Sequence, residues 1–270
     1  MDRRAIGVFD SGLGGLTAVR ELRRLLPREK LIYFGDTGRV PYGGRSRQTI
    51  QKYALQDVAF LRQFDLKGIV IACGTATTTS LELLRETHPD LPIWGVVEPA
   101  ALAARQATKN GRVGLIGTAA TIHSGAYERA LAGQGGGPEV LSKACPLFVP
   151  LVENGRIEPG DVVIETVCAE YLAPMKEFGA DTLILGCTHY PLLRPIIGNF
   201  MGPEVALVDV GEACARRVAG ELAVQNALSG GEGGLRCYVS DRIEGFAQQA
   251  SRFLGEDLSG QVEQVDIDKY

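Results

Sequence analysis

Two stretches of the sequence resemble each other, and each carries a cysteine directly after an apolar segment. The first spans residues 68–77 and contains Cys73, and the second spans residues 182–191 and contains Cys187. In both, a predicted strand enters a short turn with hydroxyl side chains and then a predicted helix. Such corners are typical of parallel sheets, which bind ligands at the carboxyl ends of their strands. The repeated corner therefore predicts an α/β fold whose two halves offer one thiol each to a shared cleft.

The remaining sequence follows the same alternation of strands and helices. Further strands are expected at residues 5–9, 31–35, 92–96, 112–117, 205–208 and 235–239, with helical periodicity at 46–64, 100–109, 161–178, 211–222 and 243–254. Two prolines in residues 145–153 predict an ordered, non-helical path there. The spacing between the corners that follow the strands at 5–9 and 112–117 is close to the spacing between the two cysteines, which suggests an internal duplication.

Composition excludes several classes of protein. A length of 270 residues suggests roughly two domains. A net charge of −4 without a dense Lys/Arg cluster gives no reason to expect nucleic-acid binding. The longest uncharged apolar stretch, residues 68–81, is too short to cross a bilayer, and residues 1–4 lead into a strand without a secretory signal. The lack of both segments predicts a cytoplasmic protein. In a reducing cytosol, six cysteines without a CxxC pair are expected to be free thiols, and three histidines without ligand spacing predict no metal site.

Two loops after predicted strands are candidate ligand contacts. The first, Asp10 to Gly15, lacks the glycine spacing of a dinucleotide site and the Gly-Lys-Ser/Thr of a P-loop. We expect it to bind a carboxylate or an ammonium group, with Asp10 as its charge; the alternative is that Asp10 only caps the following helix. In the second loop, residues 36–44, Tyr42 either donates a hydrogen bond to a ligand or packs the loop onto the sheet.

Two cysteines at strand ends are compatible with three kinds of chemistry. They could form a redox pair, although neither lies in a CxxC context. One could be a nucleophile with His189 as its base, which leaves the other unexplained. In the third, the two thiols are acid–base groups on opposite faces of one carbon. A thiol pKa of about 8.5, lowered beside a helix N-terminus, lies near the working pH. One thiolate removes a proton and the opposing thiol delivers one, which inverts a stereocentre.

Several motifs together resemble glutamate racemase. They are residues 10–15, Asp36 with residues 41–43, residues 72–75, 117–121, 146–153 and 186–191. The resemblance extends over essentially the whole chain. It implies a cofactor-independent bacterial enzyme that supplies D-glutamate for peptidoglycan, with a small-molecule substrate and a homodimeric state. It also implies two pseudo-symmetric parallel-sheet α/β domains, residues 1–97 with 208–270 and residues 98–207, with the active site in the cleft between them.

The resemblance also implies roles for individual residues. Cys73 takes the α-proton from D-glutamate and Cys187 from L-glutamate, while Asp10 assists Cys73 and His189 assists Cys187. The residues implied to bind the substrate are Asp10, Ser11, Pro41, Tyr42, Gly43, Gly74, Thr75, Thr118, Thr121, Glu153, Thr188 and His189.

One position departs from the family pattern, which has Asn-Thr after the first cysteine where this chain has Gly74 and Thr75. Loss of a side-chain hydrogen bond to a charged substrate costs about 1.5–3 kcal/mol, so we expect weaker handling of glutamate and recovery in Gly74→Asn. Two other functions stay open: a racemase for aspartate or another acidic amino acid, and a non-catalytic protein that binds acidic amino acids.

Overall fold

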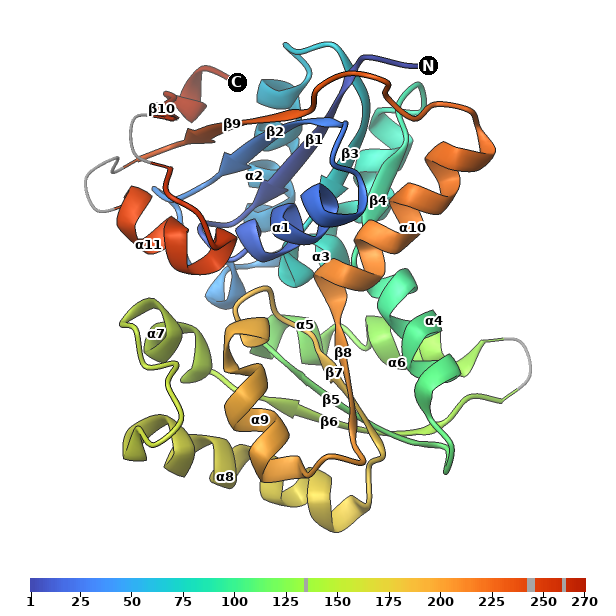
Figure 1. Ribbon diagram of the computed structural model, residues 1–270, viewed down its shortest axis with the longest axis vertical. Helices are drawn as coiled ribbons and strands as arrows, with labels where there is room; N and C mark the ends of the chain where they lie inside the picture. Colours follow the sequence, from blue (N-terminus) through green and yellow to red (C-terminus); the bar gives the residue numbers. More distant parts are fainter. Residues whose placement is uncertain (134–135, 242–245, 259–260) are drawn as a thin grey trace.

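The computed structural model describes residues 1–133, 136–241, 246–258 and 261–270 and contains two parallel sheets, one above the other (Figure 1). The first sheet has six strands in the order β10-β9-β2-β1-β3-β4. Their bounds are β1 (Ala5–Asp10), β2 (Lys30–Gly35), β3 (Leu66–Ile71), β4 (Ile93–Gly95), β9 (Gly234–Val239) and β10 (Val262–Gln264). Every neighbouring pair is parallel.

The second sheet has four strands in the order β6-β5-β7-β8, again all parallel. Its strands are β5 (Arg112–Gly117), β6 (Glu139–Ala144), β7 (Thr182–Leu185) and β8 (Ala206–Asp209). β1, β3 and β7 are buried along their whole length, because helices cover both faces of each sheet. The prediction of a parallel-sheet α/β fold is confirmed.

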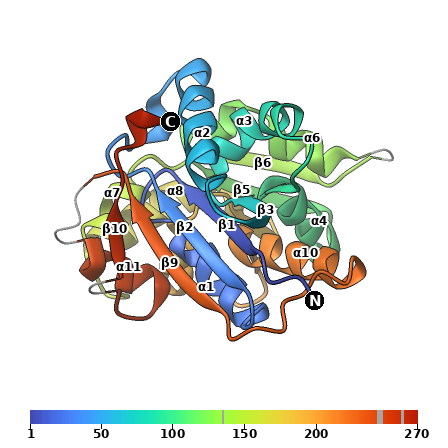
Figure 2. The same ribbon diagram turned by 90° about the horizontal axis from the view of Figure 1, so that it is seen from above.

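Helices cover the first sheet on both faces, as the view from above shows (Figure 2). α1 (Leu16–Leu25), α10 (Val210–Val224) and α11 (Phe246–Leu254) pack on the face that carries Val8 and Val70. α2 (Arg47–Leu61) and α3 (Gly74–Thr87) pack on the opposite face. The helix predicted over residues 243–254 is confirmed from Phe246, and its first residues lie outside the described part of the chain.

In the second sheet, α4 and α6 pack together on one side, and α8 lies beside α9 on the other (Figure 1). The helix bounds are α4 (Val97–Ala107), α5 (Ala119–His123), α6 (Ala126–Ala132), α7 (Phe148–Glu153), α8 (Val162–Phe178) and α9 (Arg194–Met201). The described residues also include the short 3₁₀ turns η1 (Tyr42–Gly44), η2 (Tyr190–Leu193) and η3 (Ile267–Lys269).

The non-helical path expected near Pro146 and Pro150 is wrong, because α7 begins at Phe148 and runs through Pro150. Pro150 is the third residue of this helix. The first turn of an α-helix has no intrahelical partner for its N–H groups, so a proline there removes no hydrogen bond. Pro174 lies in the interior of α8, where a proline does remove an intrahelical hydrogen bond. The helix nevertheless continues past it to Phe178.

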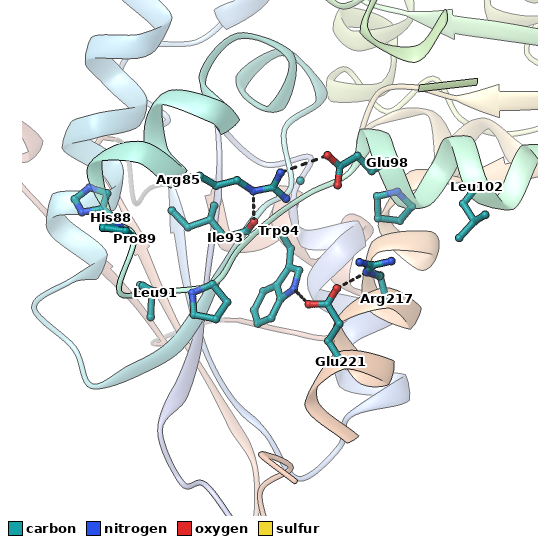
Figure 3. Close-up of a pocket in the computed structure, with 13 residues that line it drawn as sticks. Arg85, His88, Pro89, Leu91, Ile93, Trp94, Glu98, Leu102, Arg217 and Glu221 are labelled. Atoms are coloured by element: carbon teal, nitrogen blue, oxygen red, sulfur yellow. Dashed lines mark hydrogen bonds and ion pairs between the residues drawn. The ribbon is translucent and has the colours of Figure 1, made fainter. Parts of the chain in front are cut away.

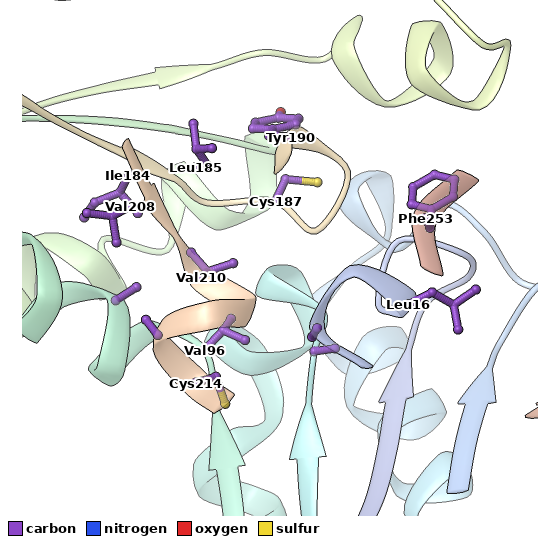
Figure 4. Packing of buried hydrophobic residues seen from close by; sticks show 14 of the residues in the cluster. Leu16, Val96, Ile184, Leu185, Cys187, Tyr190, Val208, Val210, Cys214 and Phe253 are labelled. Carbon is purple, nitrogen blue, oxygen red and sulfur yellow. The ribbon is translucent and has the colours of Figure 1, made fainter. Parts of the chain in front are cut away.

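The chain passes between the two sheets at two places. It leaves the first sheet through α4 and returns where β8 leads into α10, with Asp209 Oδ1 accepting hydrogen bonds from the backbone N–H groups of Gly211 and Glu212. One apolar core spans both sheets, and in Figure 4 Leu185 and Cys187 lie on one side of it and Leu16 on the other.

The division into domains stays a prediction, and β8 runs through its second boundary, to Asp209. In the described parts of the chain, no helix has both the length and the apolar character of a membrane span.

Candidate active site

A cavity of about 600 Å³ lies where the carboxyl ends of the strands of both sheets meet. The first sheet contributes the segments after β1, β2 and β3, and the second contributes those after β5, β6 and β7. All the predicted catalytic and substrate-binding residues except Asp10 line this cavity. The structure therefore brings together side chains that are far apart in the sequence, although their individual roles stay predictions.

Cys73 lies between β3 and α3 and is the N-cap residue of that helix. Its Sγ accepts a hydrogen bond from the backbone N–H of Ala76 at 3.4 Å and lies 3.6 Å from Ser11 Oγ. Burial, and next the negative charge of Asp10, raise the pKa of Cys73 to about 12. The hydrogen bond at the helix N-terminus opposes this rise, but burial is the larger effect, so the expectation of a lowered thiol pKa is wrong for Cys73. Cys73 therefore rests as a thiol.

Asp10 is fully buried behind the cavity wall, at the end of β1. Its Oδ2 accepts a hydrogen bond from the backbone N–H of Gly12 at 3.0 Å, while Oδ1 has no hydrogen-bond partner among the described residues. Burial raises the pKa of Asp10, against the opposing charge of His189. The alternative that Asp10 caps the next helix is wrong, because Gly15 occupies the N-cap position of α1 without a side-chain cap.

The corner that carries Cys187 differs from the one that carries Cys73. After β7, residues 186–189 form a turn that leads into η2, and α9 begins only at Arg194. Cys187 is therefore not at the N-terminus of an α-helix, and that expectation is wrong. Its neighbour is an imidazole instead, with Cys187 Sγ 3.9 Å from His189 Nδ1.

His189 is held from several sides. Its Nε2 lies 3.0 Å from Glu153 Oε1 on α7, and the ring of Phe253 on α11 packs edge-on at 5.2 Å between centroids. Burial lowers the pKa of His189, but its hydrogen bonds to Cys187 and Glu153 outweigh burial and raise the pKa to about 10. At neutral pH the protonated ring therefore places a positive charge beside the Cys187 sulfur.

Tyr42 packs its loop onto the protein and does not offer its hydroxyl to the cavity. The hydroxyl lies 2.5 Å from Asp36 Oδ2 and 3.0 Å from Asp57 Oδ2, both fully buried. Arg39 contacts the same two carboxylates, Asp36 through Nε at 2.6 Å and Asp57 through Nη2 at 3.0 Å. Burial, and next the charge of Asp36, raise the pKa of Asp57 well above its ordinary value. The loop that presents Pro41 and Gly43 is thus fixed by the ion pair between Arg39 and Asp36 and by buried hydrogen bonds to Asp57.

Hydroxyl groups bridge the cavity from sheet to sheet. Thr75 Oγ1, in the first turn of α3, lies 3.0 Å from Thr118 Oγ1, the N-cap residue of α5. Thr121 Oγ1 accepts a hydrogen bond from Thr118 Oγ1 at 3.0 Å, and Thr17 Oγ1 donates to the backbone carbonyl of Thr188 at 2.9 Å. The closed arrangement of the two sheets is therefore held by polar contacts at the site itself.

Sequence reasoning missed an apolar wall of the cavity, formed by Cys145, Pro146, Val149 and Pro150. The signal was present, because Pro146, Val149 and Pro150 lie within the motif that contains Glu153 and Cys145 directly precedes it, but nothing in the sequence shows which face of α7 turns inward. Apolar walls exclude water and strengthen electrostatic interactions within the cavity.

A second cavity, of about 300 Å³, lies between β4, α4 and α10 (Figure 3). Its polar groups pair with one another: Trp94 Nε1 donates to Glu221 Oε2 at 2.6 Å, and Arg85 lies 3.3 Å from Glu98. None of the residues that line it is a cysteine. The chemistry predicted for the paired thiols therefore belongs to the larger cavity.

Three free cysteines line the larger cavity, and two of them, Cys73 and Cys187, follow strands of different sheets. They are close enough that charge on Cys187 contributes to the raised pKa of Cys73. A carbon atom bound between them would have one sulfur available on each face. This arrangement can remove a proton from one face and deliver another to the opposite face.

Comparison with known proteins gives a consistent result. Residues 6–218 match the Asp/Glu/hydantoin racemase family. A glutamate racemase of Geobacter metallireducens is 46% identical, over 99% of this chain and 98% of that protein. The solved structure of a glutamate racemase from Bacillus anthracis superposes with a TM-score of 0.93 at 37% identity, over 98% of each chain. That of Francisella tularensis, in complex with D-glutamate, gives 0.92 at 35% identity over the full length of both chains.

A more distant structure, an aspartate racemase of Picrophilus torridus, shares the fold at 16% identity and a TM-score of 0.54, over 80% of this chain and 94% of that one.

Proposed function

The chain belongs to the Asp/Glu/hydantoin racemase family, and we propose that it interconverts L- and D-glutamate by moving a proton at the α-carbon between Cys73 and Cys187. The observation that carries this proposal is that Cys73, after a strand of the first sheet, and Cys187, after a strand of the second, line a single cavity as free thiols. Glutamate is favoured over aspartate because full-length relatives named glutamate racemase are 43–46% identical, whereas the aspartate racemase resembles this chain in fold only.

The charges of the bound substrate change the protonation of Cys73 before the proton is transferred. Cys73 rests as a thiol because it is buried. The ammonium group of a bound amino acid brings a positive charge near the sulfur, which favours the thiolate. Cys73 then removes the α-proton of D-glutamate, and the proton that completes L-glutamate comes from Cys187 on the other face. The reverse reaction exchanges these roles.

The groups beside each thiol differ, and so do the roles we propose for them. Asp10 lies behind Cys73, and its negative charge opposes a permanent thiolate there. His189, protonated and paired with Glu153, balances negative charge on Cys187. The remaining predicted residues offer hydroxyl and backbone N–H groups to the two carboxylates of glutamate: Ser11, Gly43, Gly74, Thr75, Thr118, Thr121 and Thr188.

We also propose the biological setting that the family resemblance implies. The chain would act as a homodimer in the bacterial cytoplasm and supply D-glutamate for peptidoglycan, without a cofactor. These statements rest on the resemblance and on full-length relatives that are named glutamate racemase.

Circular dichroism of L-glutamate incubated with the purified protein, under reducing conditions and without added cofactor, tests the proposal. We expect the signal to decay to zero. A flat trace with a folded protein, together with decay for L-aspartate, would favour the aspartate alternative. Thermal stabilisation by glutamate without entry of solvent deuterium at the α-carbon would instead indicate a non-catalytic binding protein.

A further inference from the structure

The corner that carries Cys187 rests against glycines of the first sheet. A Cβ atom built on Gly74 would lie 2.7 Å from the backbone carbonyl oxygen of Gly186. A Cβ atom built on Gly14 would overlap the side chains of Thr188 and His189. Two glycines, one after β1 and one after β3, therefore let residues 186–189 approach the first sheet more closely than a side chain at either position would allow without a shift.

Gly74 and Gly186, which lie in close contact, are each adjacent in sequence to one of the two cysteines of the site. Gly74 follows Cys73, and Gly186 precedes Cys187. On the basis of the proposed function, we infer that Gly74 is a positioning residue: its missing side chain sets how closely the two sulfurs approach opposite faces of the substrate. This role differs from the one expected from the sequence, in which glycine merely lacks a hydrogen-bonding amide.

The backbone conformation gives no other reason for a glycine here. Gly74 is the first residue of α3 and is not among the glycines with positive φ, so an alanine would fit its torsion angles. Alanine is also the better helix former. There is no space for the Cβ atom of an alanine, because the nearest atom is the backbone oxygen of Gly186 rather than the flexible end of a side chain.

Gly186 cannot easily move aside. Its N–H donates to the backbone carbonyl of Ile116 at 2.8 Å, and its own Cβ position lies 2.6 Å from the same oxygen. The corner is therefore fixed to β5. We therefore expect a side chain at residue 74 to push α3 and the corner at Gly186 apart by several tenths of an ångström, which would separate Cys73 from Cys187.

Two substitutions separate this role from the missing amide. Gly74→Ala adds only the Cβ atom, and Gly74→Asn adds the Cβ atom and an amide. If the close approach matters, both variants lose kcat/KM for glutamate by about tenfold, as expected for a misplacement below 1 Å. If the missing amide matters, Asn exceeds the wild type while Ala does not. The matched control is Gly220→Ala, at a helical position of α10 with nothing within 4 Å of the added atom.

A second readout tests the position of the sulfurs directly. D-glutamate is incubated in D₂O and sampled at low conversion. In the wild type, the proton removed by Cys73 is followed by delivery of a deuteron from Cys187, and the label enters L-glutamate. When Cys187 is further away, the Cys73 sulfur exchanges its proton with solvent and returns a deuteron to the same face. The ratio of labelled D-glutamate to labelled L-glutamate then rises.

We expect this ratio to rise in Gly74→Ala and Gly74→Asn and to match the wild type in Gly220→Ala. Because both products come from the same folded molecules, the ratio remains readable when a variant folds poorly. An unchanged ratio in Gly74→Ala, or a kcat/KM of Gly74→Asn above the wild type, would overturn the inference. If the wild type itself fails to racemise glutamate, the proposed function fails before the variants are compared.

Discussion

His189 Nε2 lies 3.0 Å from Glu153 Oε1, so a carboxylate on α7 supports the imidazole beside Cys187. The hydrogen bond and the charge of Glu153 are among the causes that raise the pKa of His189 to about 10. The pairing connects two segments of the second sheet's half at the wall of the cavity. A change at Glu153 should therefore alter the protonation of His189, the imidazole that lies beside Cys187.

Glu153→Gln should lower the pKa of His189 and shift the alkaline limb of the pH profile of kcat/KM to lower pH. The Glu153 side chain is 38% exposed. Solvent screening keeps the loss to at most about 1 kcal/mol, or up to about fivefold in kcat/KM at neutral pH. Rates of racemisation between pH 7 and 10.5 measure both effects. An alkaline limb that coincides with that of the wild type would exclude this role for Glu153.

Stability should fall with rising pH through the titration of His189. Its pKa is raised in the folded protein from an ordinary 6.5 to about 10, so the folded state binds the proton more tightly. The resulting stabilisation is complete below pH 6.5 and is lost as the pH rises through about 10. Thermal unfolding between pH 6 and 10.5 should show a steeper decline of Tm for the wild type than for His189→Gln. Parallel curves would contradict the assignment.

Cys73→Ser and Cys187→Ser should each lower kcat/KM by about 10²–10⁴, the usual contribution of a positioned acid–base group. Cys187→Ser should still exchange the α-proton of D-glutamate with solvent, because Cys73 remains, and Cys73→Ser should retain exchange only with L-glutamate. Proton NMR in D₂O measures both. Cys214→Ser, in the buried face of α10, is the control for loss of a buried thiol. Equal loss of exchange with both enantiomers in each variant would contradict this division of roles.

Arg39→Ala should destabilise the protein by about 3–5 kcal/mol, because it leaves the buried Asp36 carboxylate without its cation and removes a hydrogen-bond donor from Asp57, whose pKa is raised by burial. The KM for glutamate should also rise, since the loop that carries Pro41 and Gly43 loses its anchor. Chemical denaturation measures the first effect and steady-state kinetics the second. The matched control, Arg62→Ala, breaks an exposed ion pair with Asp90 and should cost no more than about 1 kcal/mol. Similar losses in both variants would refute the argument from burial.

Local patterns in the sequence determined the elements and the two corners of the site. Strands such as residues 66–71 are continuous apolar runs because both faces of the sheet are covered. This pattern and the helical periodicity between strands are properties of short segments. They sufficed for the parallel α/β fold and for placing Cys73 and Cys187 at strand ends. The family motifs then indicated the residues that line the cavity, with Asp10 as the exception.

Only the tertiary structure decided which of these groups meet. The sequence left the role of the Tyr42 hydroxyl open, because its partner Asp57 lies on another helix. It gave no sign that the second corner enters a 3₁₀ turn, or that Glu153 reaches His189 from 36 residues away. The approach of Gly74 to Gly186 depends on how closely the two sheets pack. Contacts between distant segments depend on the closure of the whole chain, and no local period encodes that closure.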